Sequence, residues 1–223
     1  MKKSIIIFIT FLTVITCSSF TIDETIIEDN NKEFDIDNIP SYLKTYAAEE
    51  YSMCGQGSVK SYMDYKLITS PSSKQFRFIN EYMYVDEETG FLYDADGFVG
   101  AALGSHFGQI GDRFYFTLEN GVTLPIVKIE SKADRDTDSS NCYNPYDNSV
   151  IEFVVDTQIA NNYFGQFGNN LVLSGNYGNY AAYKGNIVKV EKVTETKLNN
   201  EIIYSKNEDK NNDLNIFYYG SGY

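Results

Sequence analysis

Four carboxylates lie within nine residues of this chain, at a density that could support acid–base chemistry. They are Glu130, Asp134, Asp136 and Asp138, and Glu152 follows inside an apolar stretch. Carboxylates held close together repel one another, which raises the pKa of one of them and keeps it protonated. A carboxyl group that is protonated near neutral pH can act as a general acid. The segment therefore predicts acid–base catalysis, against the alternative of a solvated turn in which Asp and Thr bind backbone amides.

The sequence gives less support to a metal site or to a nucleophilic cysteine. The four acids carry hard oxygen ligands, but their spacing matches no calcium loop, and Asp94-Ala95-Asp96-Gly97 lacks the closing Glu of an EF-hand and so favours a plain turn. His106 is the only histidine, which excludes a His-rich zinc site. His106 could pair with Cys54 or Cys142 in a cysteine hydrolase, but the sequence favours a histidine in a surface turn. We expect no metal and no cofactor.

The N-terminus has the three parts of an export signal. Met1-Lys2-Lys3 precedes an apolar stretch, residues 4–16, that is too short to span a bilayer, and Cys17-Ser18-Ser19 follows. The segment ending at Cys17 is similar to a bacterial lipobox, in which the cysteine is acylated, but Thr16 replaces the expected small residue. Ordinary cleavage near Ser18 remains the alternative. The pattern predicts an extracellular or cell-envelope location, with the protein secreted or lipid-anchored through Cys17.

The charge and composition of the chain limit the kinds of partner that it can bind. The chain has 18 basic and 31 acidic side chains, a formal net charge of -13. Such a surface repels polyanions, so we expect no nucleic acid partner and a membrane contact only through a lipid anchor. Outside the cell, Cys54 and Cys142 could form one disulfide, although the sequence does not show that they meet. We expect a monomer held together by an aromatic-rich β core.

Composition also divides the chain into four parts. Residues 1–19 are the signal peptide with its lipobox-like end, and residues 20–48 are an acidic linker of low hydrophobicity. Residues 49–195 are expected to form a β-barrel domain, and residues 196–223, rich in Asn, Asp and Lys, a mobile tail. An amphipathic helix is expected at 41–53.

Alternating apolar residues, broken by Gly and Pro, predict an all-β domain. Strands are expected at 59–63, 65–69, 75–79, 113–118, 122–129, 150–156, 170–174 and 182–190. The clearest hairpin is 113–129, where Asn120-Gly121 favours a type I′ turn.

The order of pieces from Ala101 to Asp156 resembles the double-psi β-barrel, and within it the 3D-domain type of secreted proteins from Gram-positive bacteria. The resemblance rests on Ala102-Leu103-Gly104-Ser105, on Ile110-Gly111 leading into Arg113-Phe114-Tyr115-Phe116, on the hairpin, and on the acidic loop followed by Val150-Ile151-Glu152-Phe153. It implies a double-psi-like six-stranded β-barrel with additional strands and flexible termini.

Proteins of this superfamily include lytic transglycosylases, which cut peptidoglycan, and expansin-like wall proteins, which loosen or bind it without cutting. Of the three aspartates in the 3D pattern, the first is missing here, while Glu130 and Glu152 lie where the second and third would come. The resemblance implies peptidoglycan glycan strands as the partner. The expected function is a peptidoglycan lytic transglycosylase with Glu130 or Asp134 as general acid/base and Asp138 and Glu152 as positioning residues. The alternative is a non-catalytic, expansin-like or glycan-binding module of the cell wall.

Overall fold

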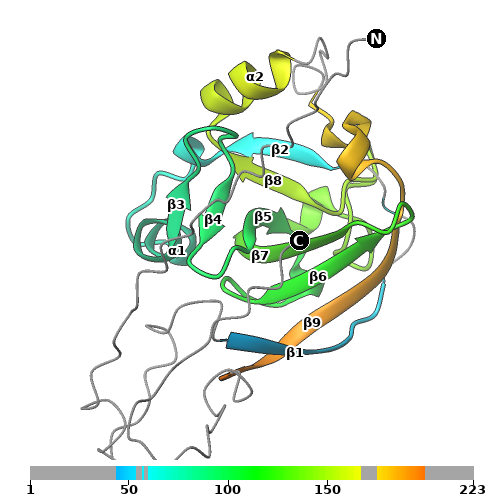
Figure 1. Cartoon of the computed structure of the whole chain (residues 1–223). Coiled ribbons are helices and arrows are strands. Elements are labelled where there is room, and N and C mark those ends of the chain that lie inside the picture. The colour runs from blue at the N-terminus through cyan, green and yellow to red at the C-terminus, as the bar shows by residue number, and fades with distance from the viewer. Residues whose placement is uncertain (1–43, 54–56, 58–59, 167–174, 199–223) are drawn as a thin grey trace, which may run out of the picture. The chain divides into compact units, whose positions relative to one another are not determined.

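The structure is a computed structural model that describes residues 44–53, 57, 60–166 and 175–198 (Figure 1). All of these residues belong to one compact unit. The expected signal segment with Cys17, the acidic linker as far as residue 43, Cys54, the expected strand at 170–174 and the tail from residue 199 lie outside the described residues.

Strands make up most of the regular structure. They are β1 (Lys44–Glu50), β2 (Ser61–Asp64), β3 (Met83–Val85), β4 (Leu92–Asp94), β5 (Val99–Leu103), β6 (Arg113–Leu118), β7 (Thr123–Ser131), β8 (Glu152–Val155) and β9 (Ile187–Leu198). The α-helices among the described residues are α1 (Lys74–Tyr82) and α2 (Thr157–Gly165). Short 3-10 helices are η4 (Tyr65–Leu67), η5 (Ser105–Phe107), η6 (Asp134–Asp136), η7 (Tyr177–Asn179) and η8 (Ala181–Tyr183). In the part of the chain that the structure describes, no helix has the length and apolar character needed to cross a membrane.

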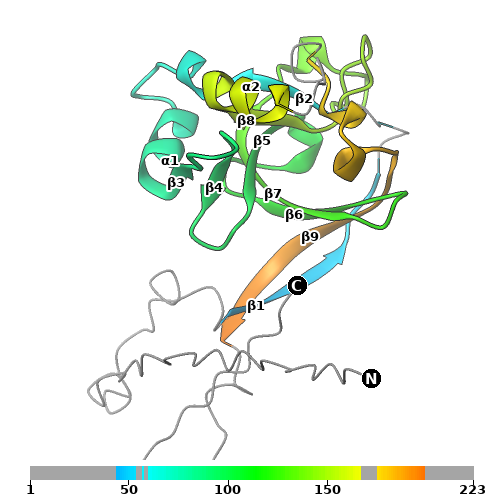
Figure 2. The same cartoon turned by 45° about the horizontal axis from the view of Figure 1, so that its top comes forward.

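The nine described strands form one mixed sheet, which confirms the all-β expectation. Hydrogen bonds link them in the order β1-β9-β6-β7-β5-β4-β3, and β8 pairs with β5 and carries β2. The β5–β7 and β2–β8 pairs are parallel, and the others are antiparallel. Figure 2 shows β1 and β9 as a two-stranded ribbon that extends beyond the other strands. Among the described residues, β1 and β3 each pair with one neighbour and are the two ends of this strand order. The closure of the sheet into a barrel therefore stays a prediction.

The hairpin of β6 and β7 is where the sequence predicted it, but its turn is of a different kind. Leu118 N donates to Val122 O, which leaves a three-residue loop, Glu119 to Gly121. Gly121 has a φ of 84°, whereas Asn120 is not among the described residues with positive φ. A type I′ turn needs positive φ at both central residues, so this connection is instead the three-residue kind with a left-handed Gly.

Four local expectations are wrong wholly or in part. The expected strand at 182–190 begins as η8, and β9 starts only at Ile187. In the other three, a distant contact or a cap decides the structure. Residues expected to be helical form β1, which pairs along its whole length with β9. The predicted strand at 75–79 is part of α1, which Ser73 caps by accepting a hydrogen bond from Phe76 N at 3.1 Å. The predicted strand at 65–69 is largely η4. β1 thus begins inside the range assigned to the linker, and β9 extends past residue 195 into the range assigned to the tail.

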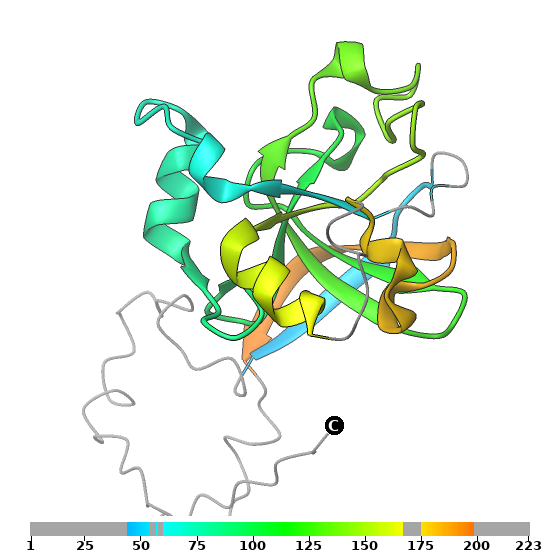
Figure 3. The ribbon, with the colours of Figure 1, turned by 90° about the horizontal axis from the view of Figure 1, so that it is seen from above.

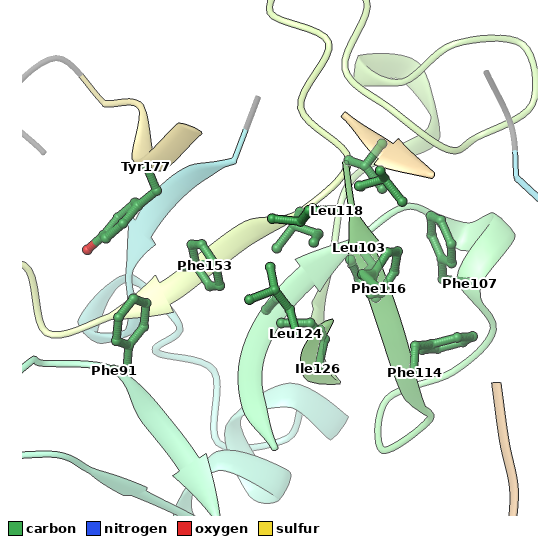
Figure 4. Packing of buried hydrophobic residues seen from close by; sticks show 14 of the residues in the cluster. Phe91, Leu103, Phe107, Phe114, Phe116, Leu118, Leu124, Ile126, Phe153 and Tyr177 are labelled. Atoms are coloured by element: carbon green, nitrogen blue, oxygen red, sulfur yellow. The ribbon is translucent and has the colours of Figure 1, made fainter. Parts of the chain in front are cut away.

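The sheet has a hydrophobic cluster on each face. The larger one is aromatic and includes Phe114 and Phe116, which share one face of β6 and are fully buried (Figure 4). Burying one such side chain stabilises the fold by about 1.5–3 kcal/mol. The second cluster joins Ala102 of β5 and Val154 of β8 to Ile79 of α1. The helix α1 therefore covers this second face, at one side of the strands in Figure 3.

Candidate functional site

The sheet brings two of the expected site residues, Glu130 and Glu152, to the two sides of one residue. Ala102 of β5 is the register partner of Glu130 in β7 and of Glu152 in β8. Neighbouring strands lie about 4.8 Å apart, so the two glutamate Cα atoms are about 10 Å apart. Residues directly opposite each other across a sheet direct their side chains to the same face. Since Ala102 belongs to the cluster that α1 covers, both carboxylates lie on the α1 face.

An irregularity in β7 produces this alignment. The register between β5 and β7 shifts after Ala101, which lies opposite Lys128, so that Ala102 lies opposite Glu130 and Ile129 is the extra residue. Such bulges redirect side chains at the ends of strands. Without the extra residue the side chain at position 130 would lie on the other face of β7, away from Glu152.

Glu152 has a raised pKa. Its side chain is half-buried, and burial is the main cause that raises its pKa above the ordinary value. Lys132 acts in the opposite direction, while the negative charges of Asp147 and Glu130 raise the pKa further. A raised pKa keeps a larger fraction of a carboxyl group protonated near neutral pH.

The partner carboxylate, Glu130, is fixed by two hydrogen bonds. Its Oε1 atom accepts from Gln75 Nε2 of α1 at 3.0 Å and from Ser131 N at 2.7 Å. The bond from Gln75 ties the helix to the end of β7. Glu130 therefore has a defined position beside Glu152.

Lys132 follows one residue after β7 and was not predicted as part of the site. Its Nζ atom donates to Ser149 O at 2.7 Å and to Ser149 Oγ at 3.0 Å, and burial lowers its pKa. One indication of this role is present in the sequence. Lys132 lies two residues after Glu130, so it is on the same face if the alternation of β7 continues. Gln75 gave no such signal, because it meets Glu130 only through the packing of α1.

The other expected site residues lie in the loop between β7 and β8. Asp134, in η6, is exposed and accepts from Ser105 Oγ at 2.7 Å. The neighbouring Asp136 is exposed as well.

Asp138 organises the backbone of this loop. Its Oδ1 atom accepts from Cys142 N at 2.8 Å and Tyr143 N at 3.0 Å, and Oδ2 accepts from Ser140 N at 2.9 Å. Burial alone would raise the pKa of Asp138, but these backbone donors outweigh it and leave the pKa below the ordinary value. An acid that is ionised so readily is unsuited to proton donation.

Cys142 is buried and disulfide-bonded, so it offers no thiol to a Cys-His pair. Its partner lies outside the described residues, and pairing with Cys54 stays a prediction. His106 Nε2 lies 2.9 Å from Ser52 O, and its ring contacts the edges of Tyr51 and Phe107. These contacts give the single histidine a packing role.

The acids of the Asp94–Gly97 segment form a turn between β4 and β5, in which Gly97 has a φ of 84°. Both carboxylates bind Arg113, and Lys44 binds the second, so they face cations of the chain itself. Across the residues that the structure describes, no group of three or more His, Cys, Asp or Glu side chains is arranged to hold a metal ion.

The site is thus a pair of carboxyl groups on one sheet face, beside a lysine: Glu130 is held by hydrogen bonds, and Glu152 has a raised pKa. A carboxyl group with a raised pKa is suited to act as a general acid. No protein-family model, curated protein or solved structure matches this chain.

Proposed function

We propose that this protein is an exported cell-envelope protein that cleaves peptidoglycan glycan strands as a lytic transglycosylase, with Glu152 as general acid and base. The observation that carries the proposal is the raised pKa of Glu152, which is half-buried beside the fixed carboxylate of Glu130. The roles expected from the sequence are exchanged: Glu152 takes the place of Asp134 or Glu130 as the acid.

The reaction needs one proton donor that later accepts a proton. Glu152 donates its proton to the glycosidic oxygen as the bond from that oxygen to the sugar C1 breaks. Positive charge develops on the sugar ring, and the carboxylate of Glu130 stabilises it. The Glu152 carboxylate then takes the proton of the sugar 6-hydroxyl, whose oxygen bonds to C1. The product is a 1,6-anhydro sugar, no water is consumed, and Glu152 is protonated again.

The disulfide at Cys142 supports the exported location, because disulfides persist in oxidising compartments and are rare in the cytoplasm. The charged, apolar and small-residue parts of residues 1–19 support it independently.

The test is to incubate the purified protein with peptidoglycan sacculi and to measure 1,6-anhydro products by mass spectrometry. Glu152→Gln is expected to lower the rate by about 10²–10⁴-fold, the usual contribution of a general acid. Asp134→Asn, which changes an exposed carboxylate, is the matched control and is expected to leave the rate nearly unchanged.

Folding of Glu152→Gln can be checked by thermal unfolding. Because the pKa of Glu152 is higher in the folded state, ionisation of this residue opposes folding once the pH exceeds its unfolded value. The amide therefore should not lower the melting temperature at pH 7. Full activity of Glu152→Gln, or retained binding to sacculi with no anhydro products from the wild type, would overturn the proposal. The second outcome would favour the binding module.

A further inference from the structure

A groove of about 450 Å³ lies outside the Glu130–Glu152 site. Its walls come from α1, the turn between β4 and β5, the start of β6 and the end of β9. Its volume falls in the range of small-molecule sites, roughly 300–1,000 Å³.

Two aromatic rings of α1 form one wall of the groove. Phe78 and Tyr82 lie with their ring centroids 5.0 Å apart, and Tyr82 is 52% exposed. Phe78 packs over Gly111, where an added Cβ atom would lie 3.1 Å from Phe78 Cε2. The glycine thus permits the close approach that holds this wall in place. Flat, exposed aromatic surfaces suit ligands that combine apolar faces with polar edges.

The opposite side of the groove is a fixed network of charges. Arg113 Nη2 lies 2.7 Å from Asp94 Oδ2, and Arg113 Nη1 lies 2.8 Å from Asp96 Oδ2. Lys44 Nζ lies 2.9 Å from Asp96 Oδ1. Asp94 and Asp96 are almost fully buried, so the network is preorganised and does not have to be ordered when a ligand binds.

The balance of charge limits what the groove can bind. Four carboxylates line it (Asp94, Asp96, Asp112 and Glu195) against two cations (Lys44 and Arg113), and Lys192, which does not line the groove, pairs with Asp112 at 2.9 Å, so one negative charge remains in excess. This excess of negative charge disfavours phosphate-rich or carboxylate-rich ligands. An uncharged ligand with several hydroxyl groups fits, because carboxylates accept hydrogen bonds from hydroxyls.

The groove continues along α1 from the Glu130–Glu152 site. Gln75, Phe78 and Tyr82 are spaced i, i+3 and i+7, which puts them on one side of the helix. Gln75 contacts Glu130, and Tyr82 lines the groove about 10 Å further along the helix axis. A backbone hydrogen bond also connects the groove to the site. Gly111, which lines the groove, donates from its N atom to Lys128 O, and Lys128 lies two residues before Glu130 in β7.

We propose that this groove binds an uncharged N-acetylated pyranose of the same glycan strand, beyond the sugar that contacts Glu152. The sugar ring packs on Phe78 and Tyr82, and its hydroxyls donate to the more exposed carboxylates of the groove, Asp112 and Glu195. The proposal extends the function proposed above by naming a second subsite for its substrate.

The test measures binding of an N-acetylglucosamine tetramer by isothermal titration calorimetry, with Glu152→Gln in every sample so that no cleavage occurs. Tyr82→Ala is expected to weaken binding about fivefold, the size of an aromatic packing contribution. Tyr84→Ala is the matched control, because Tyr84 is equally exposed at 56%, lies two residues away and does not line the groove. It is expected to bind as tightly as the parent.

A second pair of variants blocks the groove by adding bulk. Thr194→Trp fills it from β9 and is expected to abolish detectable binding, while Val188→Trp adds the same bulk to an exposed position of β9 outside the groove and is expected to have no effect. Equal binding by Thr194→Trp and Val188→Trp, or by Tyr82→Ala and Tyr84→Ala, would overturn the subsite.

The tetramer experiment separates this inference from the proposed function. Binding that depends on Tyr82 supports the groove even if the wild type yields no anhydro products. Cleavage of sacculi by the wild type, together with tetramer binding that is unaffected by Thr194→Trp, removes the subsite and leaves the catalytic proposal standing.

Discussion

The acidity of Glu152 depends on charged neighbours that act in opposite directions. Lys132 lowers its pKa, whereas Asp147 and Glu130 raise it, and burial adds the largest rise. Because general acid catalysis needs the protonated form, activity should fall as the pH rises through the pKa of Glu152. The neighbours therefore set the position of the alkaline limb of the pH–rate profile.

Changing these neighbours one at a time should move the alkaline limb of kcat/KM in opposite directions. Glu130→Gln removes a negative charge, lowers the pKa of Glu152 and should move the limb to lower pH. Lys132→Met removes a positive charge, raises the pKa of Glu152 and should move the limb to higher pH. The position of the limb is compared rather than its height, because Glu130 also stabilises charge in the reaction. Limbs that stay in place, or that move the same way in both variants, would contradict the assignment.

At the scale of elements, the loop between β7 and β8 has a different role from the one its acidic composition suggested. Three backbone N–H groups converge on Asp138 and close the loop around Cys142 and Tyr143. Asp134 and Asp136 remain exposed on η6. The loop carries the chain from Glu130 to Glu152, and its order helps to fix where β8 begins.

Removal of the Asp138 carboxylate should therefore lower stability. Asp138→Ala leaves three donors without their acceptor and should lower the free energy of unfolding by about 1–3 kcal/mol. Because the pKa of Asp138 is lower in the folded state, its contribution is present above its unfolded pKa and is lost as the pH falls through the folded value. Chemical denaturation at pH 7 and at pH 3 measures both effects. Asp136→Ala is the control, and an equal loss in the two variants at pH 7 would count against this role.

How much of these elements the sequence could predict depends on where their deciding contacts lie. The β6–β7 hairpin was predictable because its alternation and its Gly121 turn are local in the chain. The strand β1 was not, since its pairing with β9 and the Lys44–Asp96 ion pair join segments far apart. The α1 helix gave one local signal, the Ser73 cap, but its short apolar stretch also fits a strand.

The candidate site also depends on contacts between residues that are far apart in the sequence. Glu130 and Glu152 could be named from the sequence, but their roles could not, because the pKa of Glu152 depends on burial and on strands meeting at Ala102. The groove along α1 also joins distant segments. The sequence shows its Asp94–Gly97 turn as a separate acidic motif, whereas in the structure Arg113 and Lys44 bind the carboxylates of this turn.

At the scale of the whole molecule, one disulfide is expected to restrain the fold. Cys142 is disulfide-bonded and lines a small cavity together with Met53 and Gly57, which are close in sequence to Cys54. This placement favours Cys54 over Cys17 as its partner. A bond between Cys54 and Cys142 would close a loop of about 90 residues and would tie the segment after β1 to the loop between β7 and β8.

Loss of this bond should destabilise the protein by an amount that identifies the partner. The chain-entropy relation gives about 4–5 kcal/mol for a loop of this length, or a fall in melting temperature of roughly 10 °C or more. Under non-reducing conditions Cys54→Ser and Cys142→Ser should each show this fall, and the double variant should show little more, because each change breaks the same bond. Cys17→Ser should leave the melting temperature unchanged. A fall in Cys17→Ser that matches the one in Cys142→Ser would instead assign Cys17 as the partner, and would contradict both its removal with the signal segment and its acylation.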